Sequence, residues 1–391
     1  MSRFLIVVPP LTGHTNPTVS VGSELTARGH DVAWVAHPEL VADLLPPGAR
    51  LIAVSEGLPA DAVGRATARA QGLRGAAAFQ FLWEEFLLPL ARSMVPGVEA
   101  AVDEFRPDVL LVDQQALSGA VVARRRGLRW ATSATTSAEF TDPYARLPRI
   151  GEWVENALRQ IQRDFGVPET AAARSDPRFS EHLVIVFSTQ ALVGPQLRFP
   201  DHYHFVGPSV AGRVERLDDF PWDWFGDVPR VLVSLGTVNA DAGDRFYATA
   251  IEALGGRDLQ VILVGPRDRL EPVPANILVR DRIPQLAVLD RVNAVVSHAG
   301  HNTVCETLAR GLPLVVAPIR DDQPVIAQQV VDAGAGVRVR FGRVRPRDLA
   351  AAVDDVLTHP SFREAAQRIR ASFETAGGPA AAARALEALA C

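Results

Sequence analysis

A histidine and an aspartate that follow separate apolar runs are the residues of this sequence best suited to acid–base chemistry. His14 lies in LTGHTNP, behind the apolar run Phe4–Val8, and Asp113 closes the strand predicted at 108–112. If these strands are neighbours in a parallel sheet, both side chains meet at its carboxyl edge. A carboxylate behind an imidazole fixes its tautomer, so the pair can remove a proton from a hydroxyl group. The alternative is a surface histidine that caps a helix and an aspartate bonded to backbone.

A second polar group follows two apolar runs within residues 292–323. The first run ends at His298 and opens into a helical stretch, and the second ends before Asp322 and Gln323. A helix start with small and polar residues suits a phosphate, and a carboxylate–amide pair suits sugar hydroxyls, which together favour a nucleotide-activated sugar. The residues expected at this donor site are His298, Gly300, Asn302, Thr303, Asp322 and Gln323.

Weaker signals surround the donor site. Gly236 and Thr237 end the strand predicted at 231–235, where a glycine lets a ligand approach and a hydroxyl can donate to a phosphate. An ordinary strand-to-helix turn is the favoured alternative there. Glu306 lies about one turn after Asn302 and faces either a ribose or solvent. In the segment RIPQ, Arg282 offers a flat guanidinium and Ile283 a backbone amide to a nucleobase.

Three aromatic residues, Phe79, Trp83 and Phe86, recur at helical spacing within a region predicted to be mostly helical from 60 to 105. They suit an acceptor pocket for a flat apolar molecule, although aromatic residues at this spacing more often form core. His298 and His301 are three residues apart without a third ligand beside them, so we expect no metal site. No serine lies in a nucleophile elbow, which disfavours a hydrolase triad.

Apolar runs and helical periods alternate along the chain, which predicts an α/β fold of two doubly wound, Rossmann-like domains facing across a cleft. A helix is predicted over 17–28 and ends at Gly29. A stretch near 207–230 is rich in charge, proline and exposed aromatic residues and marks the boundary. We expect an acceptor-binding domain at 1–208, a linker at 209–230, a nucleotide-sugar-binding domain at 231–375, and a C-terminal helix at 376–391 that returns to the first domain. The predicted strands are 4–8, 32–36, 51–54, 108–112, 130–133, 183–187, 231–235, 260–264, 277–279, 294–297 and 314–317.

Composition narrows the class of protein. A chain of 391 residues with 48% hydrophobic content suffices for two cores. Its net charge of −5 disfavours a nucleic-acid partner. Cys305 and Cys391 are its two cysteines, too few for a disulfide framework or a cysteine metal cluster. No signal peptide pattern and no apolar run approaching the roughly 20 residues of a membrane span are visible, so we expect a cytoplasmic protein without stable membrane insertion.

The ordered motifs of the chain resemble the family-1 glycosyltransferases of GT-B fold, especially bacterial enzymes that decorate macrolides, aromatic polyketides and other secondary metabolites. The start VVPPLTGHTNPTVSVGSELTARGHDV is similar to that family's opening, and the resemblance extends over essentially the whole chain. The later landmarks are FVGP (205–208), VSLGT (233–237), RIPQ (282–285), SHAGHNTVCETLARGLPLVVAPIRDDQ (297–323) and ETAGG (374–378).

The resemblance implies an inverting, metal-independent transfer of a sugar from a UDP- or TDP-sugar to a hydroxyl of an apolar natural product such as a polyketide or macrolide. No cofactor is implied beyond the nucleotide sugar as co-substrate, and a homodimer is compatible with the family. His14 is implied as the general base and Asp113 as its orienting partner. The implied donor contacts are His298, the turn 300–303 and Thr237 to the diphosphate, Glu306 to the ribose, and Asp322 and Gln323 to the sugar.

The chain departs from the family pattern at two places. Arg282 stands where plant relatives usually carry a tryptophan, which leaves the nucleobase open. Residues 324–328 read PVIAQ where the family often has an asparagine–alanine pair, so one polar ligand is missing or supplied elsewhere. The alternatives are a nucleotide-sugar epimerase or hydrolase of the same fold, and a carotenoid or terpenoid glucosyltransferase.

Overall fold

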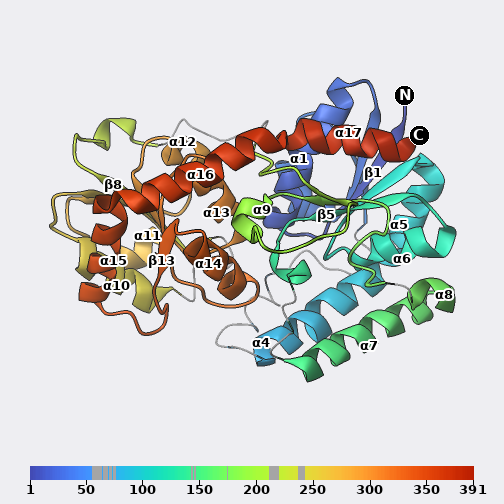
Figure 1. The fold of residues 1–391 in the computed structure, drawn as a ribbon, viewed down its shortest axis with the longest axis horizontal. Coiled ribbons are helices and arrows are strands. Elements are labelled where there is room, and N and C mark those ends of the chain that lie inside the picture. Colours follow the sequence, from blue (N-terminus) through green and yellow to red (C-terminus); the bar gives the residue numbers. More distant parts are fainter. Residues whose placement is uncertain are drawn as a thin grey trace. The chain divides into compact units, whose positions relative to one another are not determined.

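Two parallel sheets organise the chain in the computed structural model (Figure 1). The structure describes residues 1–54, 64, 69, 73, 76–141, 144, 147–173, 175–210, 220–236 and 243–391. By its contacts the chain divides into two compact units. Unit 1 comprises residues 1–189, 198–213 and 376–391, and unit 2 comprises residues 190–197 and 214–375.

The sheet of unit 1 has seven strands in the order β3-β2-β1-β4-β5-β6-β7, with every neighbouring pair parallel. The strands β1 and β4 are therefore neighbours, as the pairing of His14 with Asp113 requires. The strands are β1 (Arg3–Val7), β2 (Asp31–Ala36), β3 (Arg50–Ala53), β4 (Val109–Asp113), β5 (Trp130–Ala134), β6 (Val184–Val186) and β7 (Tyr203–Phe205). The helical elements are α1 (Thr12–Ala27), α2 (Pro38–Val41), η1 (Ala42–Leu44), α4 (Ala76–Phe81), η2 (Leu82–Leu87), α5 (Leu88–Phe105), α6 (Leu117–Arg126), η3 (Ala138–Phe140), α7 (Pro148–Asp164), α8 (Glu169–Ala172) and α17 (Gly378–Ala390).

Alternate residues of the unit 1 strands serve opposite faces of the sheet, as the period of a buried strand requires. On β1, Leu5 and Val7 belong to the core shared with α5 and α6. Phe4 and Ile6 belong to the core shared with α1 and α17. The last helix thus packs beside α1, although more than 350 residues separate their starts (Figure 1).

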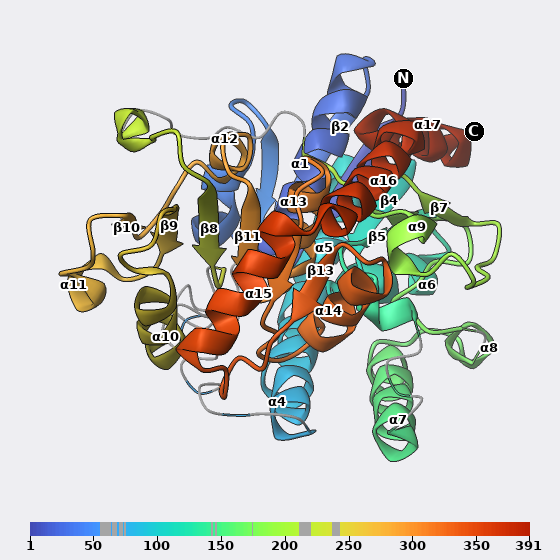
Figure 2. The same ribbon diagram turned by 60° about the vertical axis from the view of Figure 1, so that its left-hand side comes forward.

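The sheet of unit 2 has six parallel strands in the order β10-β9-β8-β11-β12-β13, and Figure 2 shows β10, β9, β8 and β11 side by side. The strands are β8 (Arg230–Ser234), β9 (Gln260–Val264), β10 (Ile277–Arg280), β11 (Ala294–Ser297), β12 (Leu314–Val316) and β13 (Gly336–Arg338). The helical elements are α9 (Gln190–Val193), η4 (Trp222–Trp224), α10 (Asp244–Leu254), α11 (Arg267–Leu270), α12 (Gln285–Leu289), α13 (His301–Leu308), α14 (Gln323–Asp332), α15 (Pro346–Thr358) and α16 (Pro360–Ala376).

The first helix begins earlier than the sequence predicted. A helix over 17–28 was expected with Pro17 at its first position, whereas α1 starts at Thr12 and carries Pro17 inside. The carbonyl of Leu11 accepts the N–H groups of His14 and Thr15, so the first turn closes before the proline. Pro17 lies in the second turn of α1 and lacks the N–H that would otherwise bond to the carbonyl four residues back. His14 consequently lies in the first turn of α1.

The predicted domain boundaries differ from the observed units at two places. The segment Gln190–Leu197, expected in the first domain, groups with unit 2, where α9 packs against α14. Residues 211–219 of the expected linker lie outside the described residues. Its following part is not an exposed connection, because Phe220 is buried in a core of unit 2 and Trp222 and Trp224 pack against that core. Trp222 and Trp224 lack helical periodicity because they belong to a short 3₁₀ turn.

The short strands β7 and β13 were not predicted. Each is three residues long and forms an edge of its sheet, and such a length shows little alternation. None of the described helices is long and apolar enough to cross a membrane.

Candidate functional site

The carboxyl edge of the unit 1 sheet brings His14 and Asp113 together. Nδ1 of His14 lies 2.9 Å from Oδ1 of Asp113. The side chain of Asp113 is fully buried, and that of His14 keeps 16% of its surface exposed. When Nδ1 carries the proton toward the carboxylate, Nε2 is the basic nitrogen of the imidazole. This is the arrangement expected of a base and its orienting carboxylate.

Thr135 completes this group and was missed in the sequence. It follows β5, the neighbour of β4, and is buried. Its hydroxyl donates to Oδ2 of Asp113 at 2.9 Å and lies 2.8 Å from Nδ1 of His14. Both oxygens of Asp113 are thereby engaged, since Oδ1 also accepts the backbone N–H of Gln115 at 2.8 Å. The position of Thr135 just after a predicted strand was the available signal.

In unit 2, His298 directly follows β11, and its ring packs against two glycines. A Cβ on Gly236 would lie 2.7 Å from Cε1 of His298, and a Cβ on Gly300 would lie 2.5 Å from its Nε2. Gly236 also has a φ of +73°, a left-handed conformation that favours glycine. Burial lowers the pKa of His298 to about 4, against a hydrogen bond to the Ser234 backbone that raises it. His298 is therefore neutral at pH 7. Thr237 lies outside the described residues.

The start of α13 forms the turn that follows His298. Ala299 takes a left-handed φ of +67° and donates its N–H to Oγ of Ser297 at 3.1 Å. Gly300 is the N-cap, and the first bond of the helix runs from Val304 N–H to Gly300 O. The N–H groups of the first turn of α13, which precede Val304, therefore lie ahead of the first bond of the helix and point out of its start, where an anion is stabilised. Asn302, half-buried, and Thr303, buried, belong to this turn.

Glu306 is linked to the segment before α13 in the sequence. It is buried on α13, and its Oε2 accepts a hydrogen bond of 2.5 Å from Nε2 of Gln285. Gln285 opens α12 behind its N-cap Pro284 and was not among the expected site residues, although it belongs to the RIPQ segment. The alternative of a solvated glutamate is therefore wrong. Arg282 is exposed, whereas the side chain of Ile283 is partly buried against the core around Val288.

Asp322 and Gln323 begin α14 beyond β12, with different surroundings. Asp322 is the half-buried N-cap. Gln323 is buried, and its Oε1 accepts the amides of Ile319 and Arg320 at 2.9 and 3.1 Å. The side-chain oxygen thus holds the preceding loop together, which leaves the amide NH₂ to donate to a ligand. Gln323 therefore stays a predicted sugar ligand, as a donor through this NH₂ group.

The aromatic residues expected to bind an acceptor belong largely to the core. Trp83 is buried and packs edge-on against Trp153 at 6.4 Å, in a cluster with Leu87 and Leu158. It offers no surface to a ligand, which corrects its assignment to an acceptor pocket. Phe79 and Phe86 are half-buried against the same cluster and stay predictions.

The segment of Trp83 is a π-helix, η2, between α4 and α5. Leu88 N–H donates to Trp83 O, five residues back. The proline that follows, Pro89, has no N–H, and its ring would clash with a carbonyl in a regular α-helical turn, which the wider π turn avoids. Within the described residues, no three His, Cys, Asp or Glu side chains gather as metal ligands would.

Comparisons with known proteins identify relatives that cover nearly the whole chain, and a family model that matches its C-terminal part. Residues 248–389 match the family model of the erythromycin biosynthesis protein CIII-like C-terminal domain. The chain is 30% identical to 4'-demethylrebeccamycin synthase of Lentzea aerocolonigenes, covering 95% of this chain and 96% of that protein. It is also 30% identical to demethyllactenocin mycarosyltransferase of Streptomyces fradiae, covering 100% of this chain and 87% of that protein.

A solved structure with the same fold is the glycotransferase of kitacinnamycin. It superimposes with a TM-score of 0.79 at 26% identity and covers 99% of both chains. Its similarity extends through both parallel sheets, so the fold predicted from the motifs is confirmed.

Proposed function

This chain belongs to the GT-B natural-product glycosyltransferases, and we propose that it transfers a sugar from a nucleoside diphosphate sugar to a hydroxyl group of an apolar small molecule. The transfer inverts the anomeric centre and uses no metal ion. The observation that carries the proposal is the 2.9 Å contact between His14 Nδ1 and Asp113 Oδ1, with the imidazole partly exposed.

In the proposed step, Nε2 of His14 takes the proton of the acceptor hydroxyl. The oxygen attacks the anomeric carbon from the face opposite the diphosphate, and the bond from that carbon to the phosphate oxygen breaks. Asp113 stabilises the resulting imidazolium, and Thr135 holds the carboxylate in place. The nucleoside diphosphate leaves with the electron pair.

The donor side of the proposal rests on the loops of unit 2. The start of α13 and the neutral His298 provide hydrogen-bond donors for the charge that develops on the leaving diphosphate. These donors support a metal-free reaction. Glu306, oriented by Gln285, is proposed to accept hydrogen bonds from the ribose hydroxyls. Asp322 is proposed to accept hydrogen bonds from the sugar hydroxyls, and the NH₂ group of Gln323 to donate to them.

The acceptor class is proposed from the relatives. One is named a synthase of 4'-demethylrebeccamycin and the other a mycarosyltransferase of demethyllactenocin, which supports a natural product as the proposed acceptor. The half-buried rings of Phe79 and Phe86 are the proposed apolar contacts to it.

The test replaces the proposed base. His14→Ala is expected to lower the transfer rate by about 10²–10⁴-fold, because proton removal by a positioned base contributes that much. The affinity for the nucleotide sugar should stay within about twofold of the wild-type value, because the base contacts the acceptor and does not bind the donor. Turnover is measured by mass spectrometry with UDP- and TDP-sugars against polyketide, macrolide and terpenoid alcohols, and donor affinity by titration calorimetry.

His182→Ala is the matched control, since His182 is an exposed histidine of unit 1 outside this group and its replacement should leave turnover unchanged. Near wild-type turnover of His14→Ala would show that the assigned base is wrong. Conversion of the sugar nucleotide at full rate without any acceptor would favour an epimerase or hydrolase instead.

A further inference from the structure

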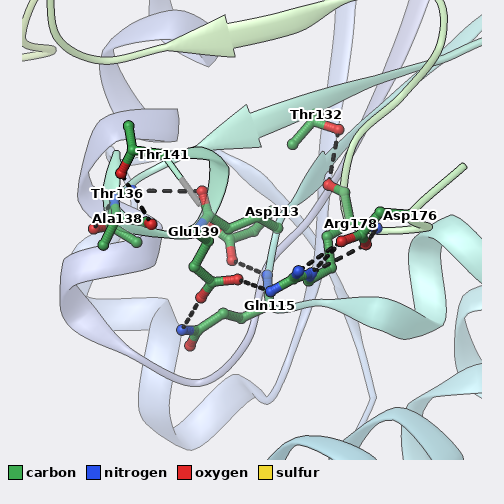
Figure 3. Close-up of polar contacts among 10 residues, drawn as sticks. Asp113, Gln115, Thr132, Thr136, Ala138, Glu139, Thr141, Asp176 and Arg178 are labelled. Atoms are coloured by element: carbon green, nitrogen blue, oxygen red, sulfur yellow. Dashed lines mark hydrogen bonds and ion pairs between the residues drawn. The ribbon is translucent and has the colours of Figure 1, made fainter. Parts of the chain in front are cut away.

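A buried arginine stands at the far end of a hydrogen-bonded path that reaches the proposed catalytic pair (Figure 3). Arg178 lies in the connection before β6 and is buried, yet it carries a charge. Its guanidinium donates to both oxygens of Asp176 and, through NH1, to Oε2 of Glu139 at 2.7 Å. Burial lowers the pKa of Arg178, but Asp176 and Glu139 outweigh it and raise the pKa overall.

The path continues from Glu139 to Asp113 through Gln115. Oε1 of Glu139 accepts Nε2 of Gln115 at 3.2 Å. The backbone N–H of Gln115 donates to Oδ1 of Asp113 at 2.8 Å, and this is the oxygen that faces His14. The side chain of Gln115 is thus anchored to Glu139, while its backbone fixes the catalytic carboxylate (Figure 3).

The distant end of the path is held by aromatic rings. The guanidinium of Arg178 lies 5.6 Å from the ring of Trp83 and 5.6 Å from that of Phe179. Stacking of this kind fixes the plane of a guanidinium. Trp83, which offers no surface to an acceptor, therefore contributes to the placement of Arg178.

The energetics favour a role in geometry. A buried ion pair adds little stability compared with well-packed apolar side chains, because desolvation offsets its attraction. What such a group does supply is fixed direction, since each donor and acceptor admits few alternative partners. In this path each link leads toward the Asp113 oxygen that orients the imidazole.

We propose that Glu139 and Gln115 are positioning residues, which, anchored by Arg178, set the hydrogen bond between Asp113 and His14 for sugar transfer. Neither residue touches the reacting atoms. They act through the loop that follows β4. The inference rests on the proposed function, because it takes His14 as the base.

The experiment breaks the path at its half-buried middle, where the fold is least at risk. Gln115→Ala and Glu139→Ala are each expected to lower kcat about tenfold with KM for donor and acceptor within about twofold, because misplaced catalytic groups lose rate rather than binding. The double variant should lose about tenfold as well, since both residues lie on one path. The downfield proton resonance of His14 Nδ1, assigned by its loss in His14→Ala, should shift or broaden in each variant.

Conservative replacements distinguish a loss of the hydrogen bonds from a loss of side-chain volume. In Glu139→Gln the new amide can accept from Arg178 and donate to Gln115 once the Gln115 amide turns over, so kcat should stay within about twofold of wild type. In Gln115→Glu two carboxylates would face each other and the link fails, so kcat should fall as in Gln115→Ala. Glu169→Ala, which removes an exposed carboxylate paired with Arg163, is the control and should change neither kcat nor the resonance.

The proposal is overturned if the single variants keep wild-type kcat and resonance, if their losses multiply to about a hundredfold, which independent residues would give, or if only KM changes. Should Glu139→Ala not fold, the two Gln115 variants decide alone. If His14→Ala loses transfer while the path variants behave as wild type, only the positioning inference fails. If His14→Ala retains transfer, the proposed function itself fails.

Discussion

At the scale of single residues, the proposed donor site depends on the absence of two side chains as much as on the presence of others. Gly236 and Gly300 leave the space into which the His298 ring fits. Because the backbone of Gly300 is not left-handed, its requirement for glycine is purely one of space. Adding one methyl group at Gly300 therefore tests whether the position of the His298 ring matters for donor binding.

Gly300→Ala is expected to displace the His298 ring, because the added Cβ would lie 2.5 Å from its Nε2. Affinity for a nucleoside diphosphate should fall about tenfold or more, which is about 1.4 kcal/mol. The measurement is titration calorimetry with UDP and TDP. Gly226→Ala is the control, since its Cβ would meet Gln260 at an ordinary 3.9 Å. Equal affinity of Gly300→Ala and the control would exclude His298 from diphosphate binding.

The contact of a site residue was predictable where the strand order fixes its position, and was not predictable where the side chain can turn toward different partners. His14 and Asp113 follow neighbouring strands of a parallel sheet, so their meeting was predictable from the strand order. The amide of Gln323 turns back to its own loop, and sequence position carries no information about that choice. Glu139 and Arg178 come from separate connections, so nothing in their spacing indicated that they meet.

At the scale of elements, helix ends show where the chain tolerates strain. The helix α5 ends at Phe105, and its C-cap, Arg106, takes a left-handed φ of +51°. The equivalent position after α6 is Gly127, with a φ of +63°. An L side chain in this conformation costs roughly 1–2 kcal/mol, which glycine avoids.

Arg106→Gly is accordingly expected to raise the free energy of unfolding of unit 1 by about 1 kcal/mol. Arg106 is exposed, so little packing is lost. Urea denaturation followed by circular dichroism checks the change. Arg106→Ala, which removes the side chain but keeps the Cβ, should give no such gain. A gain of equal size in both variants would show that the backbone conformation is not the cause.

Most elements were predictable because buried parallel strands are continuous apolar runs, and all eleven predicted strands are present with bounds within one residue of those expected. The failures have local causes. The helix α1 was expected to start at Pro17, whereas the Leu11 carbonyl closes a turn before it. The π segment η2 has no distinct period within six residues, so only the following proline hinted at it.

At the scale of the whole molecule, unit 1 is assembled from both ends of the chain. Leu386, on α17, is fully buried in the core that also holds Phe4 and Ile6. The motif similarity predicted the two sheets but not that Gln190–Leu197 belongs to unit 2. That segment is too short for its sequence to show which core it packs against.

Leu386→Ala is expected to destabilise unit 1 by about 2–5 kcal/mol, as other buried leucine truncations do. Leu349→Ala removes an equally buried leucine from unit 2 and is its counterpart. Differential scanning calorimetry should show that the two variants lower different transitions. If both lowered the same transition equally, the assignment of α17 to unit 1 would be contradicted.

The return of α17 to α1 also affects the order in which the protein can be completed during synthesis. Domains usually fold in the order in which they leave the ribosome, the N-terminal one first. Here every residue of unit 2 is translated before α17, which the core around Phe4 needs. The unit that is made first is thus the unit that is finished last, and a nascent chain stopped short of Gly378 carries every residue of unit 2 but an incomplete unit 1.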